Sequence, residues 1–295
     1  MPLFQQLLSN KKALVGLTLL VLIILIAVFA PFLSEYSPTR RVGRPHQAPS
    51  WDHWLGTTRL GHDVFTRLIH GARVSLAVGF GAGLLITIVG TILGILAGYK
   101  GGWIDEVINF FTNMVLVVPN LPLLLVLAAF IGQASPLVIA IILGCTSWAW
   151  GVRVTRAETL SIRQRDYVKS AEMLGEPSWR IMVFEIFPNL FSIVGINFIG
   201  SVIFAVIAEA TLGFLGLGDP NSVSWGIMLF NAQNASALSV GAWWDLLSPC
   251  FALALLGLSL ALLNFAIDEV ANPRLRTGGM LKKWTRMVLV GEGKL

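Results

Sequence analysis

The stretch DYVKSAEMLGEPSWRIMVFEIFP, residues Asp166–Pro188, is a short polar segment between two long apolar runs. Its first half is expected to form an amphipathic helix with Asp166 as the N-cap. Gly175 stands where this helix would end in a left-handed residue, and Glu176-Pro177 would begin a second helix with proline in its first turn. Pro188 would end that second helix before the next apolar run. The pattern predicts a two-helix elbow, which either lies on a membrane surface or presents an apolar face to a partner in water.

The first helix of this elbow separates apolar from polar side chains. Its apolar face would comprise Tyr167, Val168, Ala171 and Leu174, and the opposite face Lys169, Ser170 and Glu172. The second helix would carry Trp179, Met182, Val183 and Ile186.

The composition on either side of the elbow is that of a membrane protein. The 295 residues are 55% hydrophobic and 13% charged, with a mean hydropathy of +0.75, whereas charged residues make up about 25% of soluble domains. A transmembrane helix needs roughly 20 apolar residues. The uncharged runs are Ala13–Ser34, Val74–Tyr99, Val107–Val152, Ile186–Ala208 and Leu246–Ile267. Because Gly132–Pro136 divides the third run, the sequence predicts an all-α polytopic protein with six transmembrane helices.

The distribution of basic residues predicts the orientation. If both termini are cytoplasmic, 15 of the 21 Lys and Arg residues lie on the cytoplasmic side, as the positive-inside rule requires. The connection Glu35–Arg73 holds the other six and is the exception to the rule.

All four histidines, His46, His53, His62 and His70, lie in this long connection. On one helix His62 and His70 would be separated by about 12 Å of rise, too far to share an ion, and the other spacings match no zinc pattern. No metal site is predicted. We expect instead a folded extramembranous segment packed on the helical bundle. Cys145 and Cys250 lie in or beside predicted spans, where packing roles are favoured over a disulfide framework.

Small residues and prolines mark two of the spans. Gly90, Gly94 and Gly98 form a small-xxx-small repeat that lets another helix approach closely. Pro119 and Pro122 would free backbone groups in the third span. We interpret them as the site of a kink, and we hypothesise that this kink lines a pathway.

Polar side chains inside the apolar runs are the candidates for a translocation path: Asn113, Asn120, Asn197 and Glu209. A charge at the bilayer centre costs about 2.5–3.5 kcal/mol. For Glu209 a structural hydrogen-bonding role is therefore favoured over a pathway role. Trp225, Trp243 and Trp244 suit an interfacial position in a connection that folds back towards the bundle.

Two segments carry a resemblance to a known family. Lys169–Pro188 resembles the cytoplasmic EAA loop of ABC-importer permeases, which runs Glu-Ala-Ala, three residues, Gly, nine residues, then Ile-x-Leu-Pro. Ala171, Gly175 and Pro188 match this pattern, and Lys169, Ser170, Glu185 and Phe187 depart from it. Leu55–Leu76 resembles the LGTDxxGRDVxSRLIxGARxSL signature of the C-type permease subunit in the dipeptide/oligopeptide/nickel family, with departures at Thr58 and His62. The resemblance extends from Lys11 to Arg276.

The resemblance implies a type I ABC-importer permease in a prokaryotic inner membrane. Such a permease pairs with a second, homologous permease, binds two cytoplasmic ATPases and receives solute from an extracytoplasmic binding protein. The elbow would be the coupling helix, with contacts to an ATPase from Asp166, Tyr167, Lys169, Ser170, Ala171, Glu172, Leu174, Gly175 and Trp179. No catalytic residue and no cofactor is expected in this chain. ATP and Mg would bind the partner ATPases, because the sequence contains no GxxxxGK[ST] motif.

The same resemblance divides the chain into four parts. Residues 1–34 would be the cytoplasmic N-terminus and first anchor helix, and residues 35–73 an extracytoplasmic segment. Residues 74–268 would be the core permease domain, with the coupling loop at 153–188, and residues 269–295 a cytoplasmic tail. The substrate stays open between oligopeptides and oligosaccharides, with nickel as an alternative within the family. An ion-coupled secondary transporter is disfavoured, since no inverted repeat is apparent and Glu209 is the single ionisable residue well inside a span.

Overall fold

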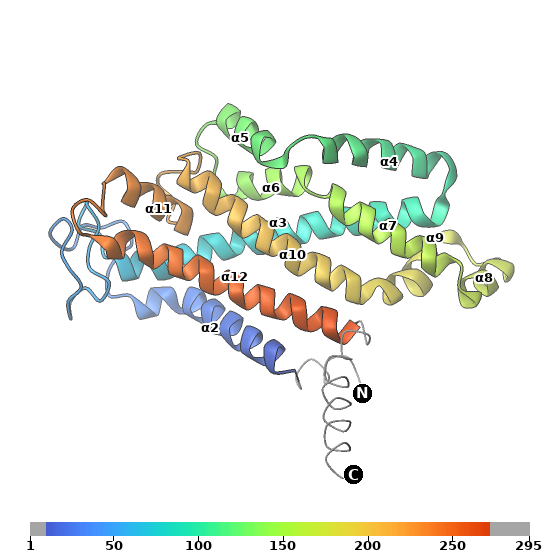
Figure 1. The fold of residues 1–295 in the computed structure, drawn as a ribbon, viewed down its shortest axis with the longest axis horizontal. Helices are drawn as coiled ribbons and strands as arrows, with labels where there is room; N and C mark the ends of the chain where they lie inside the picture. Colours follow the sequence, from blue (N-terminus) through green and yellow to red (C-terminus); the bar gives the residue numbers. More distant parts are fainter. Residues whose placement is uncertain (1–9, 272–295) are drawn as a thin grey trace, which may run out of the picture.

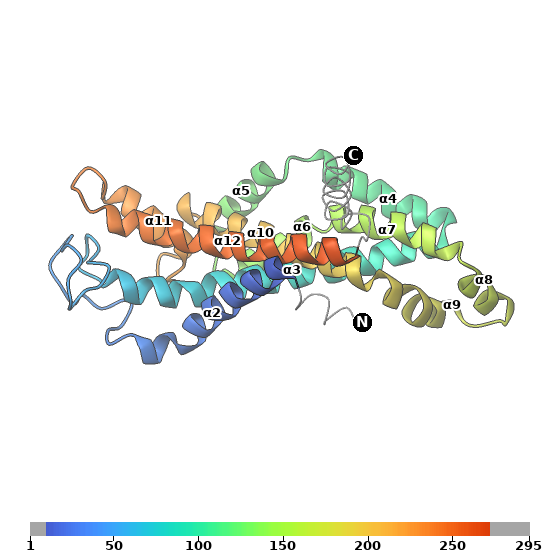
Figure 2. The same ribbon diagram turned by 60° about the horizontal axis from the view of Figure 1, so that its bottom comes forward.

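Helices are the main secondary structure of the computed structural model, which describes residues 10–271. They lie roughly along one axis in an elongated bundle (Figures 1 and 2). In chain order they are α2 (Lys11–Leu33), α3 (Val64–Lys100), α4 (Gly102–Val117), α5 (Asn120–Ile131), α6 (Pro136–Thr146), α7 (Ala149–Arg163), α8 (Asp166–Met173), α9 (Ser178–Arg180), the π-helical turn η1 (Ile181–Ile186), α10 (Phe187–Phe214), α11 (Trp225–Asn234) and α12 (Trp243–Ala271). The all-α prediction is confirmed.

Residues 10–271 contain six spans when each bent pair of helices is counted as one span. Four helices are long and apolar enough to cross a membrane: Lys11–Leu33, Val64–Lys100, Ser178–Phe214 and Trp243–Val270. The other two spans are bent pairs, α4 with α5 at 83° and α6 with α7 at 43°. The expected kink at Pro119 is therefore present. The break in the fourth span, at Ser147 and Trp148, was not predicted.

Helix α3 starts ten residues before the apolar run that predicted it. Asp63 is its N-cap, and the carboxylate accepts a hydrogen bond of 2.8 Å from the backbone N–H of Thr66. A capping side chain at this position satisfies one of the donors that a helix start leaves unpaired. The last part of the 35–73 segment is thus the first turns of a membrane helix and not a loop.

Helices α3 and α7 pack closely, and small residues on both helices form the contact. A Cβ added at Gly94 or Gly98 would lie 2.6 Å from the Cβ atom of Thr155 or Thr159. One added at Gly90 would lie 3.1 Å from the Cα atom of Gly151. The small-xxx-small repeat of α3 therefore faces a second repeat with the same spacing on α7. The predicted close approach is confirmed, and its partner is the helix that leads into the elbow.

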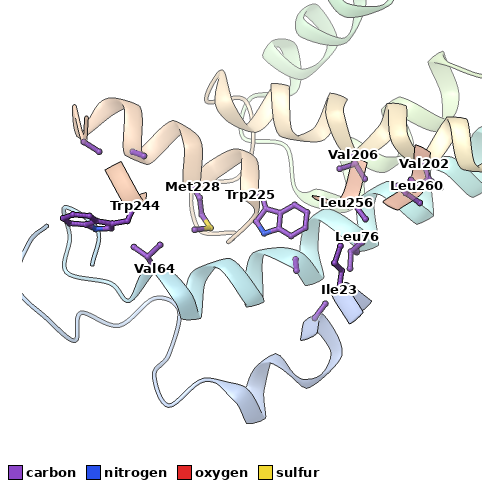
Figure 3. Close-up of a cluster of buried hydrophobic side chains, with 14 of the residues drawn as sticks. Ile23, Val64, Leu76, Val202, Val206, Trp225, Met228, Trp244, Leu256 and Leu260 are labelled. Atoms are coloured by element: carbon purple, nitrogen blue, oxygen red, sulfur yellow. The ribbon is translucent and has the colours of Figure 1, made fainter. Parts of the chain in front are cut away.

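A different face of α3 packs on α10, where Gly79 and Gly83 meet Val206 and Val202. Around this contact α2, α3, α10 and α12 share one buried cluster, in which Figure 3 shows Leu76, Val202 and Leu256 together. The cluster continues along the bundle to Trp225, Met228 and Trp244. Helix α3 is therefore the element on which both α7 and α10 are mounted.

Two tryptophans expected at the membrane interface are buried instead. The indole N–H of Trp225 donates to the carbonyl of Leu68 at 2.9 Å, and that of Trp244 donates to the carbonyl of Thr57 at 3.2 Å. Trp243 remains exposed. The buried pair stabilises the end of the bundle because each ring fills core space while its polar atom is hydrogen-bonded. The prediction that this connection folds back is confirmed, since α11 packs on α10 and α12.

The segment between Ser34 and Asp63 folds against the same end, as expected. His53 pairs with Asp63 at 2.9 Å, and His70 bonds to the hydroxyl of Ser34 at 3.2 Å. The guanidinium of Arg67 donates to Nδ1 of His62 at 2.9 Å. Burial and the charge of Arg67 lower the pKa of His62, which is consistent with the acceptor role of this nitrogen. Three of the four histidines thus have structural partners, whereas Nδ1 of His46 is buried without one among residues 10–271. The packing role expected for Cys145 and Cys250 is wrong, because both side chains are exposed.

The α3–α7 contact can be tested by filling it. Gly94→Val would press a branched side chain against Thr155 and the Val152 carbonyl, and overpacking of this kind costs about 1–3 kcal/mol. We expect a lower midpoint in a thermal unfolding scan of the detergent-purified protein. Gly81→Val is the matched control, because Gly81 lies on the same helix with open space around it. Equal midpoints for the two variants would contradict the proposed role of the contact.

Candidate functional site

The elbow lies at one end of the molecule. Figures 1 and 2 show α8 and α9 beyond the ends of the other helices, opposite the end that carries α11 and the segment between Ser34 and Asp63. Helix α7 leads into it, and the helix that continues as α10 leads out of it. The site therefore joins the fourth and fifth spans.

Helix α8 has a well-formed end. Leu174 is its C-cap, and Gly175 has φ +79°. The N–H of Gly175 bonds to the carbonyl of Glu172 at 3.1 Å, and the N–H of Glu176 bonds to that of Ala171 at 3.2 Å. These two bonds form a Schellman motif, which needs a left-handed residue at the glycine. The role predicted for Gly175 is confirmed.

The predicted start of α8 is wrong by one residue. Arg165 is the N-cap, without a side-chain capping bond, and Asp166 is the first helical residue. An acidic side chain in the first turn is favourable there because it faces the positive end of the helix dipole. Asp166 therefore stabilises the helix by charge and not by capping.

The second half of the elbow is not a separate helix. It begins at Ser178, after Pro177, and continues without a break to Phe214. Pro188 does not end it, so that prediction is wrong, as is the placing of Pro177 in the first turn. Residues Ile181–Ile186 form a π-helical turn immediately before the proline. Such a turn has wider, i→i+5 hydrogen bonding. It accommodates the N–H that proline lacks and the space that the proline ring needs. The fifth span and the outer arm of the elbow are consequently one continuous helix.

The elbow is anchored by a small apolar cluster. Val168 of α8 is fully buried with Ile181 and Ile186 of η1. Ile95 and Tyr99 of α3 belong to the same cluster. The elbow is therefore fixed both to its own arms and to the central helix.

Several large apolar side chains of the elbow stay exposed. Leu174 and Met173 are more than 80% exposed, and Trp179 and Phe184 are each 60% exposed. The rings of Trp179 and Phe184 lie 6.3 Å apart in an edge-to-face arrangement. Apolar groups gathered at a protruding end are typical of an interaction surface.

A hollow of about 420 Å³ lies between α8 and the outer arm. It is lined by Tyr167, Ser170, Ala171, Leu174, Glu176, Arg180, Ile181 and Glu185. The structure thus brings four of the expected coupling residues together, Tyr167, Ser170, Ala171 and Leu174. Lys169, Glu172 and Trp179 are exposed outside the hollow. Sequence reasoning missed Glu176 and Arg180, which form an ion pair at 2.6 Å. Their spacing of four residues on a helical arm was the available signal.

A second candidate site is a cavity of about 480 Å³ within the bundle. Of the predicted pathway residues, Asn120 and Asn197 line it, together with Asn264, which sequence reasoning missed. Asn264 is a polar residue in the sixth apolar run, so the criterion that selected the other asparagines would have found it. Ser147, at the break between α6 and α7, accepts a hydrogen bond of 3.2 Å from the amide nitrogen of Asn120.

The other two predicted pathway residues lie outside this cavity. Asn113 is exposed, and its carbonyl accepts a hydrogen bond of 2.9 Å from Arg153. Glu209 is buried and accepts a hydrogen bond of 3.0 Å from Ser75, whose hydroxyl also accepts from the N–H of Trp225 at 3.3 Å. Glu209 thus links α10 to α3 and α11 in packed surroundings.

Comparison with known proteins agrees with this architecture. Residues 90–277 match the family model of the binding-protein-dependent transport system inner membrane component. Residues 3–50 match the model of the N-terminal transmembrane domain of oligopeptide transport permease C. The chain belongs to this permease family. The resemblance to C-type permease subunits is thereby confirmed, and the chain is a membrane permease of a binding-protein-dependent importer.

Three curated relatives illustrate the similarity of the permease. The dipeptide transport system permease protein DppC of Bacillus subtilis is 35% identical over 92% of this chain and 85% of its own length. The oligopeptide transport system permease protein OppC of the same organism is 33% identical over 91% and 87%. The glutathione transport system permease protein GsiD of Pectobacterium atrosepticum is 32% identical over 87% and 85%. The relatives are permease subunits by name and not enzymes.

The Schellman end of α8 provides a test of the permease elbow. In Gly175→Ala the left-handed backbone would cost about 1–2 kcal/mol, although the space around the new methyl group is open. We expect faster amide hydrogen exchange over residues 166–180. Gly195→Ala is the matched control, since Gly195 also faces open space but has no positive φ. Unchanged exchange in Gly175→Ala would show that the motif does not hold the elbow together.

Proposed function

We propose that this permease forms half of the transmembrane pathway of an ATP-driven importer of short peptides. The observation that carries the proposal is the protruding elbow, which is packed on α3 through a buried apolar cluster and is apolar on its exposed surface. The named relatives transport dipeptides, oligopeptides and glutathione, and each matches more than 85% of this chain. Their substrates support peptides over the oligosaccharide and nickel alternatives.

In this proposal the elbow is the coupling element on the cytoplasmic side. ATP binding draws two partner ATPases together, and a rigid arm continuous with the fifth span converts that movement into a rotation of α10. Coupling of this kind requires an element with two conformations, and both the ATPase site and the solute site must shift the equilibrium between them. The hollow beside Ala171 would receive a side chain of the ATPase, and the exposed Leu174 and Trp179 would lie on its surface. ATP and Mg would be bound by the ATPases.

A cytoplasmic elbow also determines on which side of the membrane the other partners would bind. With the elbow in the cytoplasm, both termini are cytoplasmic, and α11 and the folded segment before Asp63 lie on the extracytoplasmic side of the membrane. A solute-binding protein would dock at that end and release its peptide towards the bundle. A second, homologous permease would complete the pathway, as the binding-protein-dependent permease family implies.

The elbow assignment is testable by a charge placed in the hollow. Ala171→Arg would bury a guanidinium where an ATPase side chain is expected, and burying an unpaired charge in an interface is strongly unfavourable. We expect ATP-dependent uptake of labelled dialanine to fall more than about tenfold, and the ATPase to be lost when the tagged permease is purified. Membrane insertion should be unaffected.

The matched control for this experiment is Ala157→Arg, at an exposed alanine of α7 outside the hollow. It should keep both uptake and the bound ATPase. Normal uptake by Ala171→Arg, or a wild-type complex that contains no nucleotide-hydrolysing chain, would refute the coupling role.

A further inference from the structure

We propose that the 480 Å³ cavity within the bundle is a binding site for the peptide backbone, formed by the carboxamides of Asn120, Asn197 and Asn264. The inference rests on the proposed peptide transport and adds the chemistry of recognition inside the membrane. The site would hold the amide groups that all peptides share and would be indifferent to their side chains.

Both broken spans of the permease end at this cavity. Val118 and Asn120 flank the 83° bend between α4 and α5, and Ser147 and Ala149 flank the bend between α6 and α7. Backbone that is not helical is tolerated at membrane depth where it lines a cavity or is buried in protein. In transporters, such discontinuous helices typically form the substrate site. The convergence of two breaks on one cavity therefore indicates a site for a polar ligand.

The three asparagines each bring a buried amide atom that lacks a partner among residues 10–271. These atoms are Oδ1 of Asn120, Nδ2 of Asn197 and Oδ1 of Asn264. An unsatisfied buried polar atom costs about 1–3 kcal/mol. These three atoms have almost no accessible surface, so a ligand would pair with them once the amides turn towards the cavity that the asparagines line. Each carboxamide offers both a donor and an acceptor, which complement the C=O and N–H groups of a peptide. The bond from Nδ2 of Asn120 to Ser147 leaves its Oδ1 as the available acceptor.

The rest of the lining carries no ionisable side chain. Ile86, Trp150, Ile196 and Phe204 supply most of its bulky apolar surface. A volume of 480 Å³ is within the range of about 300–1,000 Å³ that small-molecule sites span. Without a fixed charge in the wall, peptides with acidic, basic or neutral side chains would meet the same binding groups. The site therefore suits a transporter that accepts many sequences.

A smaller cavity lies next to this site, on the side of the end that carries α11. It has a volume of about 180 Å³, shares Asn120 and Phe204 with the first, and continues along α10 to Thr211 and Leu212. Apolar residues form nearly all of its lining. Thr211 lies close to the end that carries α11, where the binding protein is proposed to dock. A peptide entering from that end would reach the carboxamides after passing Phe204.

The experiment uses the complete transporter in proteoliposomes, with labelled trialanine for uptake and a diazirine-bearing tripeptide for photolabelling. Asn197→Leu and Asn264→Leu each remove the carboxamide at similar volume. We expect each to reduce trialanine uptake and photolabelling about tenfold, the effect of losing roughly 1.4 kcal/mol of hydrogen bonding. ATPase subunits should still co-purify. Asn197→Gln, which keeps the amide, should retain part of the labelling.

The control variant is Asn113→Leu, at an exposed asparagine that does not line the cavity, and it should behave as wild type. Excess trialanine should prevent photolabelling, whereas N-methylated trialanine and maltotriose should not. Wild-type labelling in both leucine variants, or equal competition by maltotriose, would overturn the backbone site. Failure of the wild-type complex to take up trialanine would instead overturn the proposed function.

Discussion

The close approach of α3 and α7 is the contact on which the other parts of this permease depend. Gly94 and Gly98 on one helix meet Thr155 and Thr159 on the other, with no room for an added Cβ. In a bilayer, where lipid is as apolar as leucine, close packing of small residues supplies much of the association energy between helices. Since α3 also holds α10 through Gly79, both arms of the elbow are mounted on the same central helix.

This mounting connects the elbow with the cavity. The continuous helix Ser178–Phe214, which comprises α9, η1 and α10, carries both the outer arm of the elbow and Asn197. Helix α7 carries the other arm, and its first residues border the same cavity. Movement of the elbow would therefore change the cavity directly, because the connecting elements are helices and not loops.

The broken spans are kept in place by polar contacts near their ends. Arg156 of α7 forms a bidentate ion pair with Asp105 of α4, with N–O distances of 2.5 and 2.6 Å. Bidentate guanidinium–carboxylate pairs are strong and directional. The pair fixes α4 to α7 while α5 turns away by 83°. The bend at Pro119 lies at the other end of α4, beside Asn120 of the cavity.

Local signals in the sequence determined the membrane class, the number of spans, the end of α8 at Gly175 and the small-residue face of α3. Each of these features depends on composition, on helical spacing or on the conformation of one residue. Residues close together in the sequence determine all three. The tertiary structure decided the rest. It showed that the chain passes Pro188 through a π-helical turn, that Trp225 is buried, and that Asn264 joins Asn120 and Asn197. These outcomes depend on contacts between residues far apart in the chain, whose energies no local pattern contains.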